Sequence, residues 1–150
     1  MSDSTSVVGY LGGDHQRCDA LWGEVEKAAD GGDAAAATAA FERFDQALRR
    51  HLAAEETVLF PAVEEAVGLP PNAGPTAVMR AEHEQMRGLL DQMAMDLRQG
   101  DLDALIDQGD TLLMLIQQHN IKEEGVIYPM ADAELGDGRS AVLSKLIAHA

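Results

Sequence analysis

Positions expected to be buried in the predicted helices carry polar residues, which recur at the same spacing in both halves of the chain. Apolar side chains follow one another at steps of three and four along four segments, the spacing of a helix face packed against a core. Histidine and glutamate occupy positions on these stripes where leucine is expected. The segment HLAAEETVLFP at 51–61 matches HNIKEEGVIYP at 119–129, and His15 matches His83 at the same offset of 68 residues. The pattern predicts a helical core built around a polar cluster.

Clusters of glycine and proline separate the helical segments. We predict helices near 13–30, 34–66, 76–99 and 102–131, with a shorter one at 139–149. Pro61 and Pro129 are expected to kink or end their helices. A chain of 150 residues buries roughly two thirds of its unfolded surface, so residues 1–150 are predicted to form a single domain. The predicted fold is all-α, an antiparallel up-down four-helix bundle with an N-terminal covering segment over residues 1–12 and a short C-terminal helix.

Each helical hairpin is expected to bring its two histidines to the same height. Residues equidistant from the turn lie level in an antiparallel pair, and the midpoint of His15 and His51 is residue 33, in a predicted turn. The midpoint of His83 and His119 is residue 101, in another predicted turn. An approximate twofold axis relating the hairpins would bring all four imidazoles together.

The two glutamates on the stripes favour a metal site. Burying a carboxylate alone costs several kcal/mol, so core glutamates must be paired, protonated or bound to metal. A histidine and a glutamate four positions later project from one helix face and reach one centre. Imidazole and carboxylate together suit iron, manganese or zinc, and two such pairs with two further histidines fit two bridged metals. We predict His15 and His51 as ligands of one metal, His83 and His119 as ligands of the other, and Glu55 and Glu123 as the bridge.

These residues resemble the hemerythrin-like, or HHE cation-binding, family. Its four-helix bundles carry a di-iron site with a lone histidine on the first helix and His-x-x-x-Glu on the second. The match covers about residues 10–131 and includes the LFP that follows Glu55. The resemblance implies two non-haem iron ions joined by an oxo or hydroxo bridge.

Two departures from the oxygen-carrying members bear on function. Those proteins have a further histidine four residues after the first on the third helix, where this chain has Arg87, and they place a carboxylate where it has Glu124. Glu124 therefore stands as an alternative to Glu123 as the ligand. The pattern of four histidines and two glutamates looks closer to members linked to iron-centre repair, nitric oxide, and oxygen or iron sensing.

Three functions fit this pattern. The first is a protein that binds or senses oxygen or nitric oxide, and the second is an enzyme that consumes peroxide or nitric oxide, or donates iron to damaged clusters. The third is a structural zinc or manganese bundle. Tyr10 is a candidate for a ligand or gate at the site, and Cys18 for a redox role or simple packing.

Charge and composition limit the partners. The net charge of −15 repels nucleic acid and anionic membranes, so neither is expected to bind. A soluble cytoplasmic protein is expected because no segment resembles a signal peptide or a membrane span. A small diatomic ligand or peroxide is the expected partner, and a protein partner stays open.

Overall fold

The structure is a computed structural model, and it describes residues 6–71 and 73–149. These residues form helices and no strand, which confirms the all-α prediction. The helices are α1 (Val7–Asp30), α2 (Ala34–Ala54), α3 (Phe60–Val67), α4 (Pro75–Arg98), α5 (Leu102–Lys122), α6 (Tyr128–Glu134) and α7 (Arg139–His149). Two π-helical turns, η1 (Glu55–Leu59) and η2 (Glu123–Ile127), join α2 to α3 and α5 to α6, and a short 3-10 helix, η3 (Gly136–Gly138), precedes α7.

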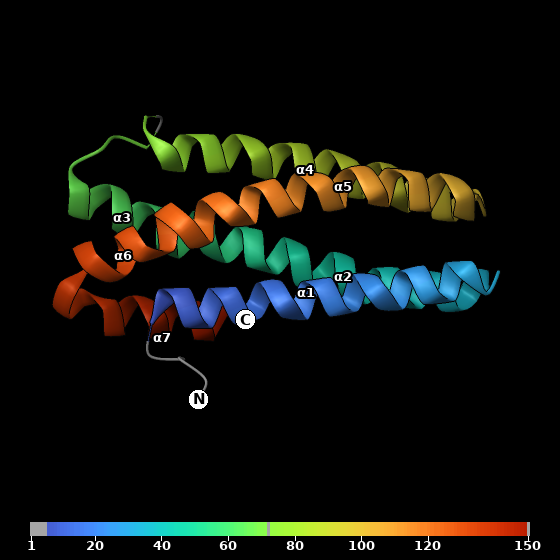
Figure 1. Cartoon of the computed structure of the whole chain (residues 1–150), viewed down its shortest axis with the longest axis horizontal. Coiled ribbons are helices and arrows are strands. Elements are labelled where there is room, and N and C mark those ends of the chain that lie inside the picture. The colour runs from blue at the N-terminus through green and yellow to red at the C-terminus, as the bar shows by residue number, and fades with distance from the viewer. Residues whose placement is uncertain (1–5, 72, 150) are drawn as a thin grey trace.

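The helices line up as rods that lie side by side in a helical bundle (Figure 1). The rods are α1, α2 with α3, α4, and α5 with α6. The chain runs along α1 and returns along α2, and α4 and α5 form a second hairpin of the same kind. Contacts between α1 and α5 and between α2 and α4 join the hairpins.

Both hairpins close with the same turn. Gly32 and Gly100 have φ angles of 71° and 70°, a left-handed conformation that glycine adopts without steric cost. The aspartate after each glycine caps the next helix, since the carboxylates of Asp33 and Asp101 each accept a backbone N–H bond of 3.0 Å. The repeat seen in the sequence thus extends to the turn geometry.

Both rods continue past a proline because a π-helical turn comes directly before the helix that contains it. Pro61 and Pro129 follow these turns at the start of α3 and α6, where the missing N–H of proline is tolerated. Each turn holds one residue more than an α-helical turn, so the buried stripe shifts by one position. Val126, predicted to face the core, is 49% exposed, whereas Ile127 and Tyr128 are buried. The sequence prediction was wrong at this point because it assumed an unbroken α-helical period.

The predicted covering segment is instead part of the first helix. Ser6 caps α1 by accepting a hydrogen bond from Gly9, and the carboxylate of Asp132 in α6 accepts the backbone N–H groups of Val7 and Val8 at 2.8 and 3.1 Å. The helix therefore begins at Val7 rather than near residue 13, and residues 1–5 lie outside the described residues. The element that packs across this end of the bundle is α7, which contacts η1, α1 and α2.

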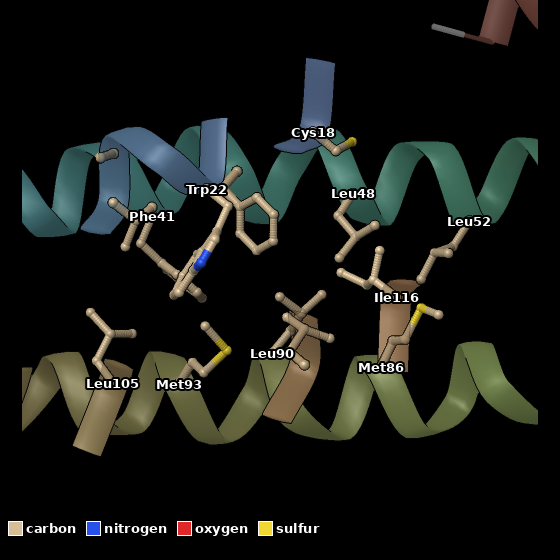
Figure 2. Close-up of a cluster of buried hydrophobic side chains, with 14 residues drawn as sticks. Cys18, Trp22, Phe41, Leu48, Leu52, Met86, Leu90, Met93, Leu105 and Ile116 are labelled. Carbon is tan, nitrogen blue, oxygen red and sulfur yellow. The ribbon is translucent and has the colours of Figure 1, made fainter. Parts of the chain in front are cut away.

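The apolar core consists of two clusters with a polar layer between them. The larger cluster, drawn in Figure 2, includes Cys18, Trp22, Leu48 and Met86. The smaller one gathers residues of α3, α6 and α7 around Leu11. Along every rod the predicted metal ligands fall between the two clusters, so the polar layer is closed to water on both sides. None of the helices in the described part of the chain is both long and apolar enough to cross a membrane.

The larger cluster depends on one close approach between helices, which gives a test of the packing. A Cβ atom added to Gly109 would lie 2.1 Å from Cη2 of Trp22. We expect Gly109→Ala to lower the free energy of unfolding by about 1–3 kcal/mol through overpacking. Gly88→Ala is the control, because a Cβ there meets nothing within 4 Å, and it should raise stability by about 0.5–1 kcal/mol. Urea denaturation followed by circular dichroism measures both, and a neutral Gly109→Ala variant would contradict this packing.

Candidate metal centre

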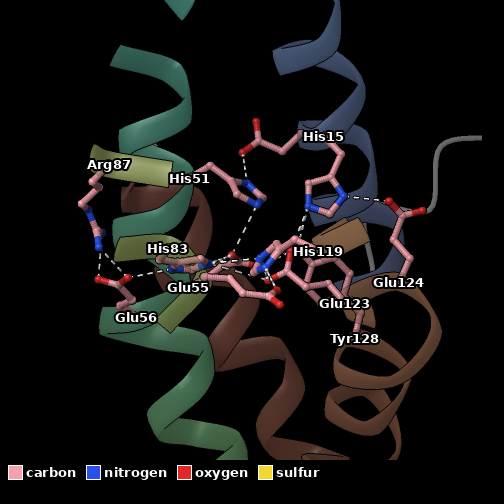
Figure 3. Close-up of polar contacts among 12 residues, drawn as sticks. His15, His51, Glu55, Glu56, His83, Arg87, His119, Glu123, Glu124 and Tyr128 are labelled. Atoms are coloured by element: carbon pink, nitrogen blue, oxygen red, sulfur yellow. Dashed lines mark hydrogen bonds and ion pairs between the residues drawn. The ribbon is translucent and has the colours of Figure 1, made fainter. Parts of the chain in front are cut away.

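All six predicted ligands lie together in the polar layer (Figure 3). Each is at most 6% exposed, and Glu55 and Glu123 have no exposed surface. They form two overlapping groups: in each, one ligand atom per residue lies within 4.8 Å of the others. The first half-site is His15 and His51, the second half-site is His83 and His119, and both groups share Glu55 and Glu123.

Glu123 spans the two half-sites. One of its carboxylate oxygens lies 3.1 Å from Nε2 of His15, and the other lies 3.1 Å from Nε2 of His119. Glu124 has its carboxylate 2.7 Å from the opposite ring nitrogen, Nδ1, of His15. The geometry therefore favours Glu123 over Glu124 as the bridging carboxylate.

Glu55 also reaches both half-sites, but with one oxygen. Its Oε1 lies 3.5 Å from Nε2 of His51 and 3.1 Å from Nε2 of His83. Each glutamate thus belongs to one hairpin and reaches a histidine in both, as a carboxylate shared between two metals would.

A ring of four outer carboxylates orients the imidazoles. Each accepts a hydrogen bond from the Nδ1–H of one histidine, so the Nε2 lone pair faces the centre. The pairs are His15 with Glu124 (2.7 Å), His51 with Asp14 (2.6 Å), His83 with Glu56 (2.7 Å) and His119 with Glu82 (2.8 Å).

The outer ring was only partly visible in the sequence. Glu56 and Glu124 adjoin the predicted bridging glutamates in the sequence, a place that suits either a hydrogen-bond acceptor or, more simply, a solvated helix flank. Asp14 and Glu82 were missed. An available signal was that an acidic residue immediately precedes the lone histidine in both halves, at the repeat offset. Exposed acids are common on helices, so that signal alone does not distinguish them from a solvated face.

The atoms that face the centre fit a cation. His51 Nε2, Glu55 Oε1 and Glu123 Oε2 are buried and make no hydrogen bond to any described residue. Nε2 of His83 lies 3.2 Å from Nε2 of His119, so two neutral imidazoles whose Nδ1–H groups donate outward would point their Nε2 lone pairs at each other. Converging lone pairs of this kind are stabilised by bound metal, and imidazole with carboxylate is a donor set for iron, manganese or zinc.

The electrostatics of the cluster attract positive charge. Burial alone would lower the pKa of His15, yet its hydrogen bonds to Glu123 and Glu124 raise it to about 9. His83 likewise has a pKa raised to about 9, against burial, by Glu55 and Glu56. Burial and then the charge of Glu123 raise the pKa of Glu55. Protons therefore occupy the metal-free cluster where cations would otherwise bind.

Tyr128 is a functional candidate that the sequence did not reveal. Its hydroxyl donates to Glu55 and lies 2.8 Å from Glu123 Oε1 and 3.0 Å from Nε2 of His15. Phe60 occupies the repeat-equivalent position and packs against His83, with ring centroids 5.5 Å apart. The comparison of LFP with IYP was the available signal, but the α-helical period put both aromatic rings off the stripe.

The structure also places Tyr10 and Cys18. Tyr10 lines a surface groove on α1 and packs beside the smaller core cluster.

Cys18 is buried, and burial raises the pKa of its thiol to about 12, which disfavours the reactive thiolate. Cys18 lines a cavity of about 10 Å³ with His15, His51 and His119, on the side of the imidazoles away from the glutamates. The cavity is otherwise mainly apolar, and its volume is about that of one water-sized probe.

These pKa shifts predict how metal-free protein responds to pH. The folded pKa values of His15 and His83, about 9, exceed the ordinary 6.5. The protonated forms of His15 and His83 therefore contribute their full stabilisation of the fold below pH 6.5, and this stabilisation is lost as pH rises through about 9. We expect the melting temperature of metal-free protein to fall by several degrees between pH 6.5 and 9.5, and that of metal-loaded protein to change much less. The metal-free variant Glu55→Gln/Glu123→Gln lacks the charges that hold the protons, so its melting temperature should change less with pH. A melting temperature that falls as steeply as in the metal-free wild type would refute this explanation.

Comparison with known proteins gives one match. The hemerythrin HHE cation binding domain matches residues 6–131, which include all six converging residues and the four outer carboxylates. No curated protein and no solved structure matches the chain. A family match over most of the chain agrees with the resemblance read from the sequence, and the chain belongs to the hemerythrin HHE cation-binding domain family.

Proposed function

We propose that this chain, as an antiparallel up-down four-helix bundle, holds two iron ions and binds or senses oxygen or nitric oxide there. The observation that carries the proposal is that Glu55 and Glu123 each reach imidazole nitrogens of both half-sites. A single metal would not require two carboxylates that each span two histidine pairs. The first half-site would hold one ion and the second half-site the other, with the glutamates between them.

The residues around the centre suit a small ligand. The iron pair would supply redox electrons and coordination positions for a diatomic molecule. The cavity beside Cys18 and Met86 lies next to three of the four imidazoles, and its volume is about that of one water-sized probe. So small and mainly apolar a space disfavours charged and larger substrates, which supports a very small ligand over an organic molecule.

One observation favours the enzyme alternative, the consumption of peroxide. Reduction of peroxide to water consumes protons, and Tyr128 places a buried O–H group against both glutamates. Burial and the two carboxylate charges raise its pKa well above the ordinary value, so the group stays protonated at neutral pH. A phenol with so high a pKa is a weak acid, so its role would be to donate a hydrogen bond or relay a proton from the glutamates rather than to supply its own.

Metal content tests the proposed centre directly. We expect two iron atoms per chain in protein produced with iron and measured by elemental analysis. His51→Ala and His119→Ala should each lower the iron content by about one half or more, because each removes one of two imidazoles from a half-site. His149→Ala, at the end of α7 and outside the repeat, should leave it unchanged. Retention of two irons in both ligand variants, or zinc in place of iron, would contradict the proposal.

Reactivity separates the binding protein from the enzyme. Reduced iron-loaded protein mixed with nitric oxide in a stopped-flow spectrometer should give a rapid absorbance change that saturates near one or two equivalents. Under excess reductant, a sensing protein should turn over hydrogen peroxide at no more than a few equivalents. Sustained turnover that falls at least tenfold in Tyr128→Phe, with iron content unchanged, would instead establish the enzyme.

A further inference from the structure

The outer charges of the two half-sites differ, although their ligands repeat. Residues 68 positions apart are equivalent, so Arg87 beside the second half-site corresponds to Asp19 beside the first. Lys122 corresponds in the same way to Ala54. The second half-site therefore has two cations where the first has an anion and a neutral residue. Arg17 of the first half-site corresponds to the neutral Gln85, which offsets one of these three charges and leaves a difference of about two.

In the second half-site both outer carboxylates are paired with a cation. Arg87 donates two hydrogen bonds to Glu56, of 2.8 and 2.9 Å, and Lys122 binds Glu82. Arg87 is 24% exposed, so water screens it only partly, whereas Glu84, its second partner, is 76% exposed.

In the first half-site the negative charge is less compensated. Glu124 bonds His15, and among described residues it is paired with no lysine or arginine. Asp19 lines the same surface groove as Glu124. Asp14 is paired with Arg17, which is 60% exposed. Glu124 is 48% exposed and Asp19 is also exposed, so water screens the charges of this half-site more than it screens Arg87.

The aromatic residues add to this difference. Tyr128 presents an oxygen to His15 in the first half-site, and Phe60 presents only a ring face to His83 in the second. The outer charges and the position of the Tyr128 oxygen therefore favour the same half-site for a cation.

We propose that the two half-sites bind metal unequally, and that the first half-site, His15 with His51, is the tighter one and fills first. This inference rests on the proposed metal centre and concerns the residues that differ between its halves, above all Arg87 and Asp19. It makes Arg87 a positioning residue that weakens cation binding at one half-site through Glu56.

Two variants measure the half-sites separately. His119→Ala leaves the first half-site complete, and His51→Ala leaves the second. The metal-free variants are titrated with Co²⁺ and followed by calorimetry. We expect the first half-site to bind Co²⁺ about tenfold more tightly than the second. This is the effect that about two unit charges have on a divalent ion across roughly 10 Å of well-screened medium. Equal dissociation constants or the reverse order would overturn the proposal.

Charge variants repeat the test with every ligand in place. In the otherwise wild-type chain, Arg87→Gln and Asp19→Asn should each narrow the ratio of the two stepwise Co²⁺ dissociation constants by about threefold. Arg87→Lys keeps the charge without the paired hydrogen bonds to Glu56, and should keep the wild-type ratio. Arg98→Gln, at the far end of α4, is the matched control and should have no effect. An Arg87→Lys variant that behaves like Arg87→Gln would assign the effect to the hydrogen bonds and refute the role of charge.

The outcomes also separate this inference from the proposed centre. Two Co²⁺ ions bound with equal affinity would refute the inequality and leave the two-metal centre standing. Fewer than two bound ions in the wild-type chain would refute the centre itself.

Discussion

The bundle is organised around two carboxylates that are buried without water. Glu55 and Glu123 have no exposed surface, and an uncompensated charge in such a place costs several kcal/mol. The four imidazoles compensate for this burial, and the outer carboxylates orient the imidazoles. The apolar clusters on either side keep water away from the two carboxylates. Without metal, protons on His15 and His83 serve as the counter-charge, which couples the stability of the fold to its occupancy by cations.

The positions of the six central residues could be predicted because their signal is periodic. Heptad spacing put them on the core face, and the midpoints of His15–His51 and His83–His119 put them at one height. The helix ends were predicted within a few residues except at the start of α1, where Gly12 and Gly13 resemble a break. The cap by Ser6 and the contact with Asp132 keep that segment helical, and the contact with α6 comes from a residue more than a hundred positions away.

What the sequence could not show follows from two physical causes. The π-helical turns change the helical period locally, so Tyr128 entered the centre from a position that a regular helix would turn away. The outer carboxylates act across helices: Asp14 bonds a histidine 37 positions away, and Glu124 one 109 positions away. Local spacing carries no information on such contacts, because any acid on a helix flank has the same pattern whether it meets an imidazole or water.

The pairing of helices into two hairpins has a consequence for how the chain folds. Contacts of α1 with α2 and of α4 with α5 join segments that are close in sequence, and such contacts form early because their loop-closure entropy is small. The contacts that dock one hairpin on the other are sparser, and they join α1 to α5 and α6, α2 to α4, and α3 to α6. Each glutamate starts in one hairpin and ends beside a histidine of the other, so a cation that binds there also fastens the two halves. Uptake of metal would then act as the last step of assembly, and its loss would loosen the seam between the hairpins before either hairpin itself.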